Sequence, residues 1–219
     1  SLTMKAAGGF LKSAACLAAL GKALQSNTTL TYLEISYNAE LDVRWEGADA
    51  AHAQDPDDPT SGLALLCAGI AAHPTLRSLH MLGAATIQAT SGTQVRDNGP
   101  RLATAVLANP NIEIFGEVPI GALRADAIKG ELALKDGRMG CAEGYVLAKL
   151  LESGAGASLE ILTLVEIYYT TEVYNTLGDD KDACVALREA CKKHSPKEIK
   201  FRSPQRPPHM NNDESGYPK

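Results

Sequence analysis

The chain has 219 residues, of which 45% are hydrophobic, and a formal net charge of −5. This length can bury a sizeable core, either as one elongated domain or as two small ones. The negative charge argues against non-specific binding to nucleic acid, which needs basic patches, and no apolar run approaches the roughly 20 residues that cross a bilayer.

Two further features bear on the compartment of the protein. No secretory signal is visible at the start of the sequence. The five cysteines form no C-x-x-C pair, which favours reduced and mostly buried thiols. We therefore expect an intracellular protein, with the cytoplasm as the simplest compartment.

The first elements are a strand end and a helix. Leu2 and Met4 alternate before the turn-like residues 7–9, which indicates that the chain begins inside a repeated unit. We expect a partner or a further segment to cover that end, because an uncapped repeat exposes a strand edge. Residues 10–25 then carry leucines at helical spacing, which predicts one apolar stripe.

The stretch from Thr28 to Asn38 reads L-x-x-L-x-I-x-x-N. Its apolar residues, Leu30, Leu33 and Ile35, predict a short strand with one inward face. The amide of Asn38 suits the turn that closes the strand, because it can bond backbone groups left unpaired there.

The same unit returns twice in a fixed register. Leu30, Leu76 and Ile112 open three strands, and each has an apolar residue six and ten positions earlier. Chance rarely preserves several offsets at once, so this internal repeat is the main evidence for the fold. The helix of each unit is predicted just before its strand, over residues 10–25, around 63–70 and over 101–109.

The rest of the chain continues the alternation less regularly. Residues 115–132 are too short for a full helix, so this unit is expected to be a strand plus a turn, or to carry a single short helical turn around residues 122–127. The later predicted elements are a strand at 132–134, a helix at 143–152, a strand at 159–167, a helix at 179–193 and a strand at 199–201. Inserted loops are predicted near 39–61 and 85–98, within a repeat domain over 1–201, and residues 202–219 are predicted to form an extended or disordered tail.

These patterns resemble leucine-rich repeats of the ribonuclease-inhibitor-like class. The residues that carry the resemblance are the helix-to-strand linker at 25–33 and the turn at 134–140. The frequent use of Ala, Thr and Asn is similar to that in repeat proteins of single-celled algae and protists. The resemblance implies an α/β fold, a curved solenoid with parallel strands on its concave face and helices on its convex face. It places Leu33, Leu79, Phe115 and Leu162 on successive rungs of one ladder. Members of this class mostly bind other proteins.

In such a ladder, the residues between the leucines project from the sheet as a partner-binding surface. Tyr32 and Tyr37 are the expected anchors, because tyrosine offers contact area at a low entropy cost. The candidate partner-binding residues are Tyr32, Glu34, Tyr37, Arg77, His80, Glu113, Glu160 and Thr163. We expect a protein partner and a scaffold role as a subunit of a larger assembly.

No catalytic constellation is predicted. The five histidines are scattered without metal-binding spacing, and no nucleophile elbow or phosphate loop occurs, so no metal and no cofactor is expected. Arg138 lies in a repeat turn, loosely where the similar Ran GTPase-activating proteins carry a catalytic arginine, although Gly137 stands where those proteins have an asparagine. A GTPase-regulating protein and the sensor fragment of a larger switch protein therefore stay open as alternatives.

Overall fold

The computed structural model describes residues 1–3, 14–35, 59–81, 99–134, 141–165, 179–194 and 196–202. Its strands are β1 (Leu2–Thr3), β2 (Tyr32–Glu34), β3 (Ser78–His80), β4 (Ile114–Phe115), β5 (Gly130–Leu134), β6 (Leu159–Val165) and β7 (Glu198–Arg202). Its helices are α1 (Ala14–Ser26), α3 (Gly62–Ala72), α4 (Gly99–Ala108), α5 (Ile120–Arg124), α6 (Cys141–Glu152) and α7 (Asp179–Lys193). The predicted inserted loops and tail lie outside the described residues, apart from residues 59–61 and the end of β7.

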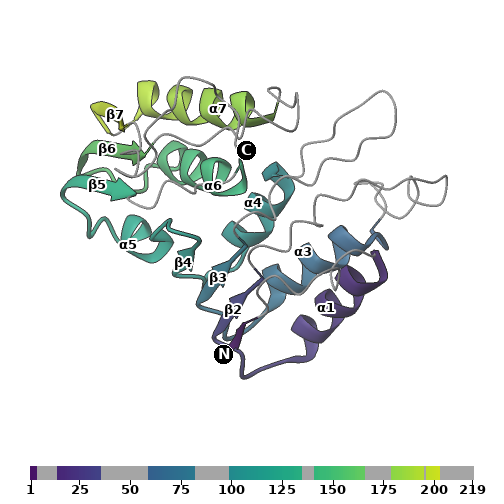
Figure 1. Cartoon of the computed structure of the whole chain (residues 1–219). Coiled ribbons are helices and arrows are strands. Elements are labelled where there is room, and N and C mark those ends of the chain that lie inside the picture. Colours follow the sequence, from purple (N-terminus) through teal and green to yellow (C-terminus); the bar gives the residue numbers. More distant parts are fainter. Residues whose placement is uncertain are drawn as a thin grey trace, which may run out of the picture.

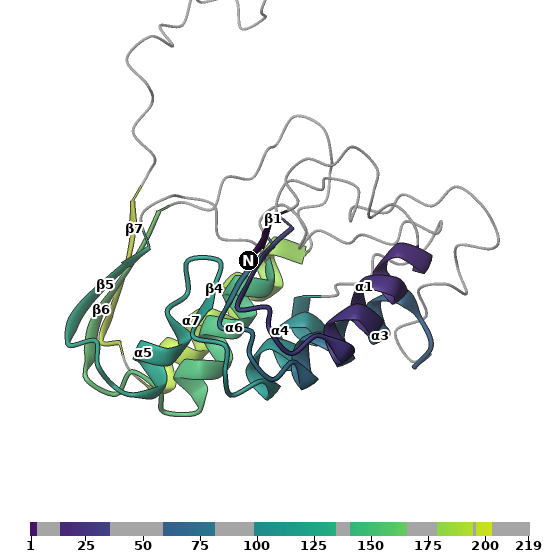
Figure 2. The same ribbon diagram turned by 90° about the horizontal axis from the view of Figure 1, so that it is seen from below.

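The chain is a mixed α/β protein with two parallel sheets. One sheet has the order β1-β2-β3-β4 and the other the order β5-β6-β7, so neighbouring strands also follow one another along the chain. The helices form one row, in which α1 packs on α3, α3 on α4, α4 on α6 and α6 on α7 (Figure 1). Seen from below, β5, β6 and β7 lie on one side and the helices α6 and α7 lie beside them (Figure 2). None of the described helices is long and apolar enough to cross a membrane.

The predicted helix-to-strand register is confirmed. Leu33 pairs with Leu79, and Leu79 pairs with Phe115, and all three side chains are fully buried. The helix residues six positions before Leu30, Leu76 and Ile112 are buried as well; they are Leu24, Ile70 and Val106. A fixed offset therefore places the inner residues of helix and strand in the same layer of each unit.

The connection from helix to strand is held by one side chain in each unit. Asn27 Oδ1 accepts the N–H groups of Thr29 and Leu30 at 2.9 and 2.7 Å. His73 Nδ1 accepts those of Thr75 and Leu76 at 3.2 and 3.0 Å. Each acceptor thus satisfies backbone donors that neither the helix nor the strand can pair.

The third unit adds a link to the unit before it. Asn109 is fully buried, and its Oδ1 accepts the N–H of Asn111 at 2.9 Å. Its Nδ2 donates to the carbonyl oxygens of Ile70 and His73 at 2.8 and 2.9 Å. This one amide therefore closes its own linker and satisfies the end of helix α3.

The prediction of a single ladder is wrong, because the ladder stops at β4. After Phe115 the chain turns at Gly116, whose φ is +57°, and Val118 pairs antiparallel with Phe115. The N–H of Phe115 donates to the carbonyl of Val118 at 3.0 Å, and the N–H of Val118 donates back at 2.8 Å. The free edge of β4 is thus occupied by its own turn, so β5 cannot pair there and Leu162 belongs to the second sheet.

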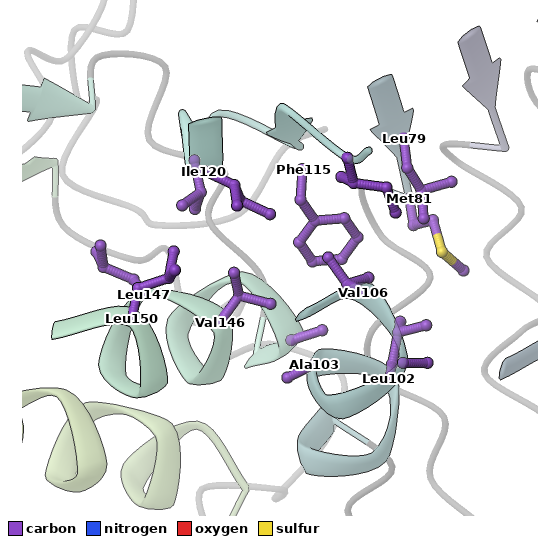
Figure 3. Packing of buried hydrophobic residues seen from close by; sticks show 14 of the residues in the cluster. Leu79, Met81, Leu102, Ala103, Val106, Phe115, Ile120, Val146, Leu147 and Leu150 are labelled. Atoms are coloured by element: carbon purple, nitrogen blue, oxygen red, sulfur yellow. The ribbon is translucent and has the colours of Figure 1, made fainter. Parts of the chain in front are cut away.

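Both sheets nevertheless share one hydrophobic core. Figure 3 shows the Phe115 ring directed from β4 toward Val106 on α4, with Ile120 on α5 and Val146 on α6 close by. These residues belong to one buried cluster that also holds Leu162. The short helix α5 lies between β4 and β5 in the chain, close to the helical turn considered for residues 122–127, and it stands outside the row because α4 packs directly on α6 (Figure 1).

Helices α1 and α3 approach each other through two glycines. A Cβ atom on Gly21 would overlap the carbonyl oxygen of Leu65, and a Cβ atom on Gly69 would overlap the carbonyl oxygen of Gly21. Backbone contacts this close are available only where a helix has no side chain, and the packed backbone cannot give way as a flexible side chain would.

We predict that Gly69→Ala lowers the free energy of unfolding by about 1–3 kcal/mol, because the added methyl forces the two helices apart. This loss should appear although alanine favours a helix by about 1 kcal/mol over glycine. Urea denaturation measures it. Ala68→Gly, at the exposed neighbouring position, is the control and should cost only about 0.5–1 kcal/mol. A Gly69→Ala protein as stable as the parent would contradict the close approach.

A second prediction concerns the pH dependence of stability. Burial lowers the pKa of His73 from its usual 6.5, and Nδ1 can accept two N–H groups only in the neutral ring. The unfolded chain takes up a proton that the folded chain resists, so this residue stabilises the protein above about pH 6.5 and loses its contribution as the pH falls. His73→Asn, which copies Asn27 and Asn109, should fold and should lack this loss between pH 7 and 5.

The matched variant for that measurement is His73→Ala. It removes the acceptor altogether and should cost about 1–3 kcal/mol at pH 7, because two backbone donors lose their partner. Urea denaturation across the pH range separates the two effects. If the free energy of unfolding of His73→Asn falls between pH 7 and 5 as much as that of the parent, His73 is not the titrating group.

Candidate functional site

The outer face of the first sheet carries the candidate site, and we define it by Tyr32, Glu34, Ser78, His80 and Ile114. These residues alternate with the buried Leu33, Leu79 and Phe115, so they point away from the core. Register places Tyr32, Ser78 and Ile114 in one row across three strands, and Glu34 beside His80 in the next row. The sheet therefore brings together Tyr32, Glu34 and His80, as the repeat pattern predicts.

Four of these side chains contact one another. The Tyr32 hydroxyl donates to Glu34 Oε2 at 2.9 Å, and the Tyr32 ring lies 5.3 Å from the His80 ring at an interplanar angle of 37°. The Ser78 hydroxyl and His80 Nε2 are 2.9 Å apart and share a hydrogen bond. Glu34 is only 9% exposed, so it offers little surface of its own beside the Tyr32 ring that it bonds.

The Ser78–His80 contact does not by itself make a nucleophilic site. Acyl transfer also needs N–H donors aimed at the developing oxyanion. Parallel strands direct their N–H groups within the plane of the sheet, and the N–H groups of Ile35 and Gly116 already donate to His80 and Leu79 carbonyls at 2.8 Å. The geometry therefore suits recognition of another molecule by side chains.

The rim of this face is charged. Arg77 and Glu113 directly precede β3 and β4 and form an ion pair in which both side chains are more than half exposed. Their backbones are also linked, because the N–H of Glu113 donates to the Arg77 carbonyl at 2.8 Å. An exposed pair of this kind adds at most about 1 kcal/mol to stability, so both groups remain available to a partner.

The second sheet separates the last two predicted contact residues from the first face. Glu160 is exposed at the start of β6, as predicted. Thr163 is only 2% exposed, and its hydroxyl donates to Glu131 Oε1 at 2.5 Å. The prediction that Thr163 meets a partner directly is therefore wrong, because its polar group is already buried and paired inside the protein.

Two predicted residues, Tyr37 and Arg138, lie outside the described residues. The sequence analysis missed Ile114, which is a large hydrophobic residue 42% exposed on the outer face. Its alternation with the inward Phe115 was the signal that could have found it. Among the described residues, no group of three or more His, Cys, Asp or Glu side chains could hold a metal ion.

Two buried thiols are protected from reaction. Cys67 and Cys191 are buried and free, and burial raises the pKa of each to about 11. Thiols with such pKa values are almost entirely protonated near neutral pH and are poor nucleophiles.

No protein-family model matches the chain, and neither the search of curated proteins nor the search of solved structures gives a match.

Proposed function

We propose that the chain is a leucine-rich repeat protein of the ribonuclease-inhibitor-like class and acts as a non-catalytic scaffold for protein–protein interaction. The observation that carries this proposal is the stacking of parallel strands in chain order with their inner residues in register. Repetition of this kind supports a solenoid, in which strands line the concave face and helices the convex face. The partner is a protein, and the setting is a larger intracellular assembly.

Binding through the outer face of the first sheet is supported by its mixture of apolar and polar groups. Ile114 and the Tyr32 ring supply contact area, and the Arg77–Glu113 pair supplies a charged rim. Aromatic and apolar anchors inside a polar rim are typical of binding hot spots. The hydrogen bond from Tyr32 to Glu34 holds the ring in place before a partner arrives, which lowers the entropy cost of binding.

We predict that Tyr32→Ala weakens partner binding at least about tenfold, since an anchoring aromatic residue contributes more than about 1.4 kcal/mol. Ile114→Ala should act in the same direction. Tyr32→Phe keeps the ring and loses only the hydroxyl, so it should retain most of the affinity. Lys149→Ala, at an exposed position on α6, is the control and should bind as the parent does.

The partner is first identified with a photo-cross-linking residue at position 114, compared with the same residue at position 149. Cross-linked proteins are sought in extracts of the native source, and the affinity of each variant is then measured with the purified partner. Circular dichroism checks that the variants are folded. Equal capture from both positions, or parental affinity in Tyr32→Ala and Ile114→Ala, would refute the outer face as the binding surface.

A further inference from the structure

The layer formed by β1 and α1 is the first in the described array, and it is less covered than the layers that follow. Leu2 pairs in register with Leu33, yet Leu2 is 42% exposed whereas Leu33, Leu79 and Phe115 are fully buried. Among the described residues, β1 has a strand neighbour on one edge only. An apolar residue of the inner row and one strand edge are therefore open at this end.

The helix row shows which positions receive a preceding helix. On α3, residues Leu65 and Gly69 lie against Gly21 of α1. The 46-residue offset between Leu33 and Leu79 makes Cys67 the equivalent of Gly21. The charge of Arg101 on α4 is near enough to lower the pKa of Cys67, against the larger effect of burial.

The same strand offsets identify the residues of α4 and α1 that are equivalent to Leu65 and Gly69 and that would face a preceding helix. Arg101 and Ala105 on α4 correspond to Leu65 and Gly69 on α3, since the strand offset between Leu79 and Phe115 is 36 residues. Gly69 lies against Gly21 of the preceding helix, and Ala105 is buried on α4, which packs on α3. The corresponding residues on α1 are Ala19 and Ala23, and both are exposed.

We infer that this end of the array is an interface for a further helix-and-strand layer of the same kind, with its strand parallel to β1 and its helix across Ala19 and Ala23. The interface continues the stacking already present between the described layers. The incoming helix must carry a small residue where α1 has Gly21 and α3 has Cys67. Ala105 indicates that an alanine at the receiving position is compatible with such a neighbour.

The chain itself supplies a suitable probe. Leu2 and Leu33 are 31 positions apart and are register partners. In a protein with a copy of residues 1–31 placed before Ser1, Ser1 takes the place of Tyr32 after the copied Thr31, and Leu2 takes the place of Leu33. The copy also presents a second α1 to Ala19 and Ala23. The whole chain is kept, so the extended protein tests only the added layer.

In urea, the extended protein should unfold in one transition with a higher midpoint and a larger m-value than the parent, because more surface is buried. Ala19→Arg in the original α1 should lower the midpoint of the extended protein and leave that of the parent unchanged. Gln25→Arg, at another exposed position on α1, is the matched control and should be neutral in both. An unchanged midpoint, or indifference to Ala19→Arg, would overturn the inference.

A second readout does not depend on stability. With Ala19→Cys in the original α1, labelling by a maleimide should be at least about tenfold slower in the extended protein than in the parent, because a docked helix must open first. Equal labelling rates, or an extended protein that fails to fold, count against the interface. Sedimentation of the parent adds a competing outcome, since a dimer dissociated by Ala19→Arg would assign this face to a second copy instead. These readouts report layer stacking and do not depend on whether the outer sheet face binds a partner.

Discussion

The architecture depends on how each helix is joined to the strand that follows it. A side-chain acceptor stands three residues before Leu30, Leu76 and Ile112, and it bonds backbone N–H groups that the linker to the strand would otherwise leave unpaired. This short closed connection fixes the offset between the inner residues of helix and strand. Because the offset is the same at Leu30, Leu76 and Ile112, successive units stack with parallel strands in register. The buried amide of Asn109 extends the constraint between units.

The break between the two sheets shows that strand pairing and helix packing need not follow one another. The turn at Gly116 satisfies the outer backbone groups of Phe115 locally, so no donor is left without a partner. The helix row passes the break without interruption, because α4 packs directly on α6. The hydrophobic core therefore continues past β4, where the hydrogen bonding between strands ends. The consequence is two separate outer faces on one core.

Periodicity in the sequence predicts the elements well, because burial of one face imposes it. The helix at 179–193 and the strand near Leu33 coincide with α7 and β2. The break at β4 was not predictable from this signal, because residues 112–118 have no regular alternation and the reversal depends on the positive φ of Gly116, which periodicity does not reveal. The role of His73 was hidden for a different reason. His73 occupies the position of Asn27 and Asn109, but histidine is not a residue typical of such linkers, and its role depends on which ring nitrogen faces the backbone. Alternation also could not reveal that Thr163 is buried and bonded to Glu131, because it does not report what packs on a strand residue.

The arrangement of the outer face leaves its side chains, and not its backbone, to meet another molecule. Backbone groups are used within the sheet plane, so chemistry on its surface must come from side chains alone. Those of Tyr32, Glu34, Ser78 and His80 already bond or contact one another, which fixes their positions on the face. A surface fixed in this way loses little entropy on binding. Affinity can then come from the two groups that offer apolar area, the Tyr32 ring and Ile114. The exposed pair of Arg77 and Glu113 can select a partner by charge at the rim.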